Sequence, residues 1–212
     1  MAGLRMSIVV STTAFLLGLL FTHWIADSLS LWKTPETQTD ASLWTAATYY
    51  SILSRMPPTL AYVYAAITVL GGATLLWSLR DGSAGNLMFD GGSIFLYATT
   101  VYVYISSVLP NFFANFTSLS LPPLATSSSI LPFPSALRTP TLELASSHLV
   151  CSVTLTGVII LQAGRWWAEQ SDDDAQEDLM GEGDEEAEEK RLRSRSRSRR
   201  REKGKAESKK TK

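Results

Sequence analysis

The residues best suited to chemistry are two histidines and one cysteine, all set in apolar sequence. His148 and Cys151 lie one helical turn apart, but a zinc site takes three or four protein ligands and the pair offers two. His23 lies near the edge of its apolar stretch, which favours a plain interfacial role. Because no carboxylate stands inside the apolar stretches, the sequence predicts neither acid–base catalysis nor an ion relay. We therefore expect a protein that is not an enzyme and that needs no metal and no cofactor.

The same apolar stretches also contain hydroxyl side chains, one amide and several small residues. Small residues let membrane helices approach closely, and each polar contact between helices contributes about 0.6 to 2 kcal/mol. Several such contacts could hold another membrane protein transiently, or they could only pack the chain's own helices. The candidate positions for these contacts are Thr12, Thr13, Gly18, Gly72, Thr99, Ser152, Thr156 and Gln162.

The elements that carry these residues are four long apolar stretches. The last one, 144–164, holds no charge, and as a helix it is roughly 31 Å long, enough to cross a bilayer core of about 30 Å. It stops at Arg165, Trp166 and Trp167, residue types that prefer the headgroup region. The sequence predicts an all-α membrane protein with four transmembrane helices, at about 6–25, 58–79, 91–109 and 144–164, within a membrane domain of residues 1–170.

The first stretch has a competing interpretation as a cleaved signal peptide. Arg5 could form its positive region, and residues 26–28 loosely fit a small-residue cleavage site. The apolar run is longer than the usual hydrophobic region of a signal peptide and ends on Trp24 and Ile25. We therefore favour a retained helix.

The connecting segments differ in length. Residues 42–54 fit a short helix lying at the membrane interface, with Leu43, Ala47, Tyr50 and Leu53 at helical spacing. Residues 80–90 read as a short turn. Residues 110–143 read as a long Ser- and Pro-rich loop, whose prolines should prevent a fifth span.

The remaining residues, 171–212, form a charged tail. It holds 13 of the 19 cations and 13 of the 20 anions, arranged as an acidic half followed by a basic half. Such a composition buries no core, so we expect disorder, apart from a helix around 185–193 that acid–base pairs would support. The Arg-Ser alternation at 193–199 resembles RNA-binding or phosphorylated segments, but attachment to four spans favours a solvated tether beside anionic lipid.

Four spans place both termini on one side of the membrane. Cations beside the spans are balanced between the two sides, so the basic tail decides and places both termini in the cytosol. Asn115 begins a glycosylation acceptor pattern in a segment that would then be lumenal. Lys209 and Lys210 stand fourth and third from the end, as in a dilysine retrieval signal of endoplasmic-reticulum membrane proteins.

Several segments together carry a family resemblance: TTAFLLGLLF in the first span, YYSILSRMPPTLAYVYAAITVLGG into the second, NLMFDGGSIFLY into the third and GVIILQAGRWW closing the fourth. Over residues 11–167 the chain resembles the fungal endoplasmic-reticulum membrane chaperone that packages amino-acid permeases. The loop around 121–140 is longer than expected for that family, and the tail matches only in being charged.

The resemblance implies a four-span chaperone whose partners are newly synthesised amino-acid permeases. It implies that the protein prevents permease aggregation and promotes their packaging into COPII vesicles, with coat components contacting the cytosolic tail. The alternative from the residues alone is a small four-span transporter or channel, against which stands the absence of charges inside the spans. A membrane tether for RNA through the Arg-Ser segment is the third hypothesis.

Overall fold

A computed structural model describes residues 2–34, 36–79, 84–119 and 132–208, with side chains placed for 3–34, 36–79, 87–119 and 132–171. Within these ranges the chain is helical with short turns and contains no strand. Four helices are long and apolar enough to cross a membrane: Gly3–Leu31, Pro58–Ser78, Leu87–Phe116 and Ser135–Ser171. The prediction of an all-α protein with four membrane-spanning helices is confirmed.

The helices follow one another with short connections. They are α1 (Ala2–Leu31), α2 (Asp40–Ser54), α3 (Pro58–Ser78), α4 (Ala84–Val103), the π-helix η2 (Tyr104–Val108), α5 (Leu109–Asn111), the π-helix η3 (Phe112–Phe116) and α6 (Ser135–Ser208). The chain divides into two compact units, Met1–Arg165 and Trp166–Lys212. The predicted boundary between membrane domain and tail at residue 170 stays a prediction.

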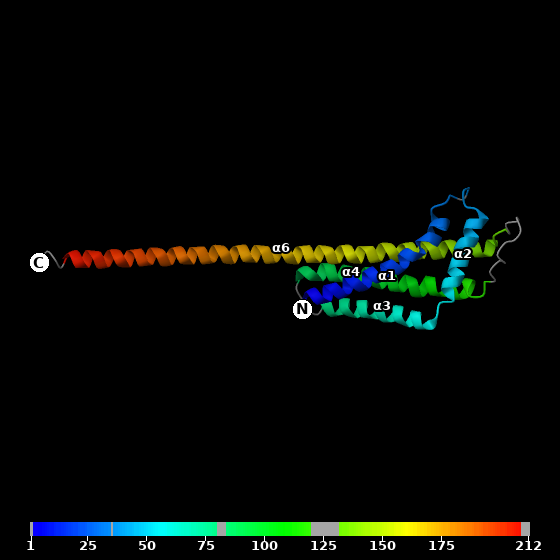
Figure 1. Cartoon of the computed structure of the whole chain (residues 1–212), viewed down its shortest axis with the longest axis horizontal. Coiled ribbons are helices and arrows are strands. Elements are labelled where there is room, and N and C mark those ends of the chain that lie inside the picture. The colour runs from blue at the N-terminus through cyan, green and yellow to red at the C-terminus, as the bar shows by residue number, and fades with distance from the viewer. Residues whose placement is uncertain (1, 35, 80–83, 120–131, 209–212) are drawn as a thin grey trace. The chain divides into compact units, whose positions relative to one another are not determined.

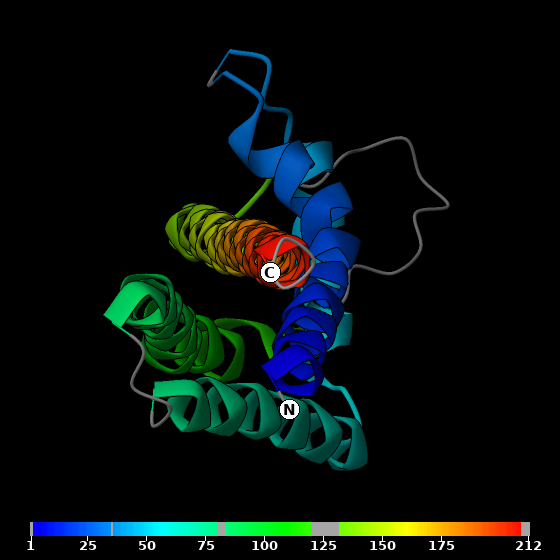
Figure 2. The ribbon, with the colours of Figure 1, turned by 90° about the vertical axis from the view of Figure 1, so that its left-hand side faces the viewer.

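The first unit is a bundle in which α1, α3, α4 and the first part of α6 lie lengthwise beside one another (Figures 1 and 2). Helix α2 crosses the bundle at one end, which we call the α2 end (Figure 1). The opposite end, where α1 begins and where α3 leads into α4, we call the amino-terminal end. Because successive spans run in opposite directions, α6 leaves this unit at the amino-terminal end.

Two apolar clusters fill the bundle. One lies at the α2 end, where Tyr50, Phe112 and Phe116 pack with Leu144 of α6. The other lies further along the helices and includes Val9, Leu75, Tyr97, Cys151, Leu155 and Val158. In this second cluster Gly71 lets α3 approach its neighbours, since a Cβ atom there would lie 2.7 Å from the Tyr97 hydroxyl and 2.9 Å from Thr12 Oγ1.

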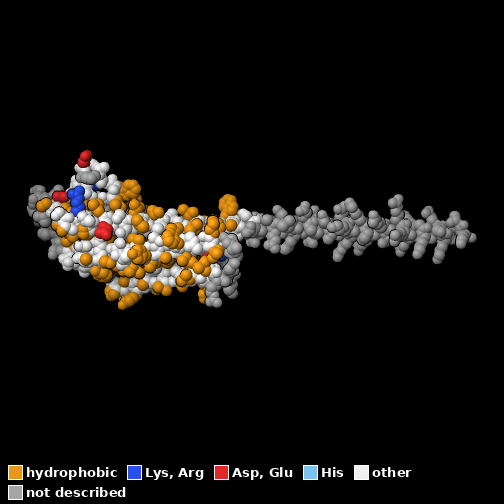
Figure 3. Space-filling view, turned by 180° about the vertical axis from the view of Figure 1, so that it is seen from behind, with side chains coloured by type: hydrophobic (Ala, Val, Ile, Leu, Met, Phe, Trp, Pro, Cys, Tyr) orange, Lys and Arg blue, Asp and Glu red, His pale blue; other side chains and the backbone are white. Residues whose placement is uncertain are grey.

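The outer surface of the bundle is apolar, as Figure 3 shows for one face. Helix α3 is the extreme case, since only 11% of its most apolar window is buried. Its side chains Tyr62, Val69 and Trp77 are 74%, 69% and 65% exposed. A surface of this kind is stable in lipid, where apolar side chains need no cover.

The short helix predicted at 42–54 is present as α2, capped by the Thr39 hydroxyl, which accepts from the Ser42 N–H at 3.3 Å. Leu43, Ala47 and Tyr50 are buried, as their spacing predicted, although their cover comes from the bundle.

The predicted loops are too long, and the prediction that 110–143 is a loop is wrong at both ends. Helical structure continues past Pro110 to Phe116, and α6 begins at Ser135 with Pro140 inside it. Pro140 removes only one backbone hydrogen bond near the start of its helix, and the Asn111 side chain donates to its carbonyl at 3.0 Å. The predicted turn at 80–90 is also shorter, because α4 begins at Ala84 and includes Asp90.

In the tail α6 continues to Ser208. Glu, Lys, Arg and Ala all have high helix propensity, and the sequence sets Glu186 four residues before Lys190 and Glu189 four before Arg193. Few residues of this segment are apolar, so its helix depends on propensity and on such charge pairs.

Candidate functional site: two buried polar clusters and an outward hydroxyl surface

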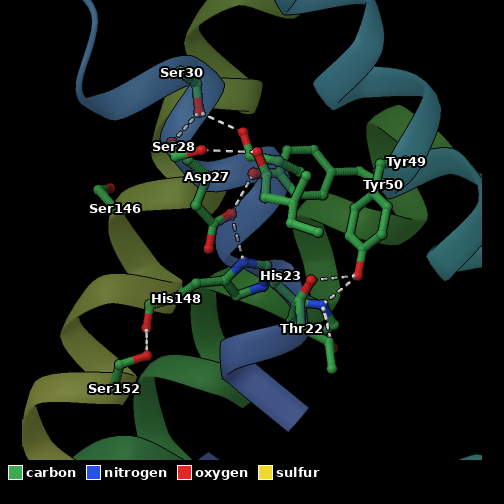
Figure 4. A network of polar contacts seen from close by, with 12 residues as sticks. Thr22, His23, Asp27, Ser28, Ser30, Tyr49, Tyr50, Ser146, His148 and Ser152 are labelled. Carbon is green, nitrogen blue, oxygen red and sulfur yellow. Dashed lines mark hydrogen bonds and ion pairs between the residues drawn. The ribbon is translucent and has the colours of Figure 1, made fainter. Parts of the chain in front are cut away.

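The first polar cluster lies at the α2 end and joins three helices (Figure 4). Asp27 of α1 accepts a hydrogen bond of 2.5 Å from the Tyr50 hydroxyl of α2. The same carboxylate oxygen lies 3.2 Å from Nδ1 of His148 on α6. All three residues are buried. One carboxylate therefore ties α1, α2 and α6 together, and we call these residues, with His23 and Tyr49, the Asp27 cluster.

His23 and Tyr49 extend the Asp27 cluster toward the outside. The Tyr49 hydroxyl donates to the Thr22 carbonyl at 3.2 Å and lies 2.9 Å from His23 Nδ1. The rings of His23 and His148 have their centres 4.9 Å apart. On α2, burial and the nearby Asp27 carboxylate raise the pKa of Tyr50 above its ordinary value. Tyr50 therefore stays protonated and keeps donating to Asp27.

The Asp27–His148 pair has the composition of a general base, but its surroundings favour a structural role. His148 is 1% exposed, and its Nε2 atom has no hydrogen-bond partner. Tyr50 and Phe112 pack against the ring, with centre-to-centre distances of 5.9 and 6.1 Å. A general base must come within hydrogen-bond distance of its substrate, and this ring is covered. The cluster acts as a clamp between helices.

The second polar cluster lies at the amino-terminal end and joins α3, α4 and α6. Arg165 Nη1 donates to both oxygens of Asp90, at 2.7 and 2.8 Å, and to the Ser78 hydroxyl at 2.6 Å. Gln162 Nε2 donates to Ser93 Oγ at 2.9 Å and approaches Asp90 Oδ1 at 3.4 Å. The ion pair is nearly dry, since the Arg165 and Asp90 side chains are 8% and 2% exposed. We call these five residues the Asp90 cluster.

The expectation that the spans contain no carboxylate is wrong. Asp27 lies in α1, which continues past the predicted end at residue 25, and Asp90 lies in α4, which begins before the predicted start at residue 91. Arg165 is a buried ion-pair partner rather than a headgroup anchor. Helical spacing puts His23 and Asp27 on one face of α1, and Gln162 and Arg165 on one face of α6. The partners that complete both clusters lie on other helices, so the spacing alone could not show them.

Three predicted contact residues lie inside the bundle. Thr12 is buried against Gly71, and its hydroxyl donates to the Ile8 carbonyl at 2.8 Å. Thr13 is fully buried, and its hydroxyl has no hydrogen-bond partner. Gln162 belongs to the Asp90 cluster. These positions pack the chain's own helices, which was one of the two predicted uses.

The other predicted positions lie further out. Gly18 is exposed, and a Cβ atom there would meet nothing within 4 Å. The hydroxyls of Thr99, Ser152 and Thr156 donate to carbonyls of their own helices, at 2.8, 2.9 and 2.8 Å. Of these three, Thr156 is exposed and the others are half-buried. Gly72 is half-buried beside Tyr97, 3.5 Å from where its Cβ atom would lie, and its neighbour Gly71 makes the closer helix contact.

One interhelical contact that the candidate set omits is a hydroxyl pair. Thr100 of α4 and Thr154 of α6 have their hydroxyls 2.7 Å apart. Thr100 directly follows Thr99, so the sequence alone could not distinguish between these two threonines.

The remaining candidates concern processing and sorting. Asn115 lies in η3, where its side-chain amide donates to Asn111 Oδ1 at 3.0 Å, a helical position that disfavours glycosylation. Lys209 and Lys210 lie outside the described residues. Among the residues whose side chains are placed, no group of three or more His, Cys, Asp or Glu could hold a metal ion.

Comparison with known proteins agrees with this architecture. The family model described as ER membrane protein SH3, which represents the SHR3 chaperones, matches residues 1–203. The Secretory component protein psh3 of Schizosaccharomyces pombe is 27% identical over 157 residues, covering 74% of this chain and 66%, just under two thirds, of that protein. No solved structure matches significantly. Because the family model covers nearly the whole chain, the resemblance drawn from the sequence is confirmed, and the chain belongs to the SHR3 chaperone family of endoplasmic-reticulum membrane proteins.

Proposed function

We propose that this chain assists the folding of amino-acid permeases in the endoplasmic-reticulum membrane, prevents their aggregation and promotes their packaging into COPII vesicles for export to the plasma membrane. Family membership supports a membrane chaperone, and the name of the S. pombe relative supports a place in secretion. The identity of the clients as amino-acid permeases and the role of the coat as a partner go beyond these two observations and are part of the proposal.

The observation that carries the proposal is the contrast between the interior and the outer surface of the bundle. Inside, both buried carboxylates have partners on other helices. Outside, hydroxyls remain among exposed apolar side chains. Thr156 and Ser106 are exposed, and each hydroxyl donates its proton to its own helix, at 2.8 and 2.7 Å. Their oxygen lone pairs can still accept a hydrogen bond.

Such a surface suits an unfinished permease. While the bundle of a polytopic protein is incomplete, its polar side chains face lipid, where unsatisfied groups are costly. An outward hydroxyl that accepts a hydrogen bond offers about 0.6 to 2 kcal/mol per contact, enough to shield a client through several contacts and weak enough to release it.

The proposed topology has four spans with both termini in the cytosol. Arg5 lies in the first turns of α1 and Arg165 near the far end of the fourth candidate span. Lys33, Arg55 and Arg138 lie after α1, after α2 and near the start of α6. Trp24 and Trp32, with ring centres 5.6 Å apart and both exposed, suit an interface at the α2 end. A cytosolic tail could then meet coat components and display Lys209 and Lys210.

A small transporter or channel remains the second candidate, because the spans hold Asp27 and Asp90 after all. Each carboxylate has partners on neighbouring helices, as structural ion pairs do. Solute flux into liposomes that contain only this protein would favour transport over the chaperone.

The test of the proposed function is removal of the protein from cells. Newly made amino-acid permeases should then accumulate in the endoplasmic reticulum in aggregated form, while soluble secretory cargo and single-span membrane proteins leave at their normal rate. Normal delivery of permeases to the plasma membrane would refute the proposal, and equal retention of all cargo would indicate a general secretory role instead.

A further inference from the structure

The third candidate span is distorted around a proline. Helix α4 passes into η2, α5 and η3, so two π-helical stretches flank Pro110. π-helical turns are rare and occur frequently at functional sites. Proline has no backbone N–H, so it cannot donate to a carbonyl of the preceding turn.

The carbonyl of Ile105 consequently lacks both of its regular helical donors, the α-helical one and the π-helical one. Its α-helical donor would be the N–H of Leu109, which donates to Tyr104 instead. Its π-helical donor would be residue 110, which is the proline. Ile105 is 60% exposed, and Tyr102 and Phe113 in the same helical stretch are 71% and 67% exposed. The acceptor thus belongs to an outward-facing part of a candidate span.

An unpaired backbone carbonyl facing lipid is costly, because acyl chains have no donor to offer. Distorted membrane helices recover such bonds from neighbouring helices, side chains or water. We propose that Tyr102, Ile105, Ser106 and Phe113, which we call the π face, bind a transmembrane segment of a client permease that donates a hydroxyl or amide hydrogen to the Ile105 carbonyl. This inference rests on the proposed function and assigns it a surface.

The surroundings of the acceptor fit a transmembrane helix. Tyr102, Ile105 and Phe113 provide an apolar contact area, and the Ser106 hydroxyl, already donating to Tyr102 at 2.7 Å, presents a second acceptor. A client segment that is apolar except for one or two donors complements this arrangement. One such hydrogen bond changes affinity by about three- to thirtyfold, so the client leaves once its own helices supply the partner.

The test places a photocrosslinking amino acid at Ile105 and, separately, at Ile160, which is equally exposed on α6 at 64%. Full-length protein is expressed in membranes while an amino-acid permease is synthesised. Pro110→Ala supplies the missing N–H and should lower the crosslink from Ile105 to the permease by about three- to thirtyfold, leaving that from Ile160 unchanged. The matched control is Pro58→Ala, because Pro58 occupies the first position of α3, where no helical hydrogen bond is missing.

A second measurement covers the case in which Pro110→Ala does not accumulate. In the permease segment that crosslinks to Ile105, Ser and Thr are replaced by Val while the chaperone is left unchanged, and the same loss is expected. The inference is overturned if the crosslink from Ile105 to the permease is unchanged both by Pro110→Ala and by the Val substitutions in the permease. It is also overturned if Ile105 crosslinks only to lipid or to a second copy of this chain. Crosslinks to permease from Ile160 but not from Ile105 overturn the π face alone, whereas none from either position contradicts the proposed function.

Discussion

The Asp90 cluster allows a quantitative test of what holds the bundle together. Asp90→Ala would leave the Arg165 guanidinium in a site where its side chain is 8% exposed, with Ser78 as its remaining acceptor in the cluster. Removing one member of a buried ion pair typically costs about 3 to 5 kcal/mol, because the remaining charge stays desolvated. At about 1.4 kcal/mol per tenfold change, the folding equilibrium should shift by about 100-fold to a few thousand-fold.

Arg165→Ala should cost less, since Asp90 keeps the Ser78 hydroxyl at 2.7 Å and the Gln162 amide at 3.4 Å. The double variant removes both charges and should be more stable than the sum of the two single losses implies, by about 2 kcal/mol or more. Such a coupling energy reports the pair itself rather than the loss of side-chain volume.

The assay is reversible unfolding of the purified protein in mixed micelles, followed by the fluorescence of its six tryptophans. Arg138→Gln is the control, because Arg138 is an exposed cation that donates to the Gln38 side chain, and its loss should stay within about 0.5 kcal/mol. Additive single losses, or an Asp90→Ala cost of less than about 1 kcal/mol, would refute the reasoning that the pair is buried and mutually dependent.

Three further predictions follow from other parts of the chain. Gly71→Ala forces a Cβ atom to within 2.7 Å of the Tyr97 hydroxyl and should destabilise the bundle by about 1 to 3 kcal/mol in the same assay, while Gly18→Ala, which meets nothing within 4 Å, should be neutral. Tyr50→Phe removes the donor to Asp27 and should cost about 1.5 to 3 kcal/mol. Because the pKa of Tyr50 is raised above its ordinary value in the folded protein, its contribution is complete below pH 10 and declines as the pH rises further, so the difference in stability between the two proteins should narrow above pH 10. Protease added outside sealed microsomes should remove the tail after residue 170, and a fully protected tail would contradict the proposed cytosolic termini.

The four spans could be predicted from the sequence because each is a long run without charges, which is a property of composition. Their ends could not. Asp27, Asp90 and Arg165 stand at the edges of apolar runs, where hydropathy assigns a charge to the loop. Only the packed bundle shows that each of these charges meets a partner on another helix. The partners of Asp27 lie 23 and 121 residues away along the chain, a separation that no local pattern reports.

The candidate contact residues fall into buried and outward-facing positions for a related reason. Thr99 and Thr100 are the same residue type, and the spacing of small residues suited both Gly71 and Gly72 on α3. Which member of each pair faces a neighbour depends on the rotation of the helix, and close packing fixes that rotation. The sequence thus predicted the class of contact and the helix that carries it, while the face required the structure.

The two clusters bear on how a membrane protein can keep its hydroxyls free for polar clients instead of pairing them inside its own bundle. If the helices could rotate, their hydroxyls could turn inward and pair with one another inside the bundle. That would hide the surface that a client needs. The Asp27 cluster and the Asp90 cluster, one at each end of the bundle, fix the rotation of α1, α2, α3, α4 and α6 through hydrogen bonds to a carboxylate, which are stronger than a contact between two hydroxyls. With the helices held in this way, the exposed positions such as Thr156 cannot turn inward, and the Ile105 carbonyl stays outward. Loosening either cluster should therefore weaken client binding at a distance from the substituted residue, so Asp90→Ala should lower the permease crosslink from Ile105 even though Asp90 lies near the other end of the span.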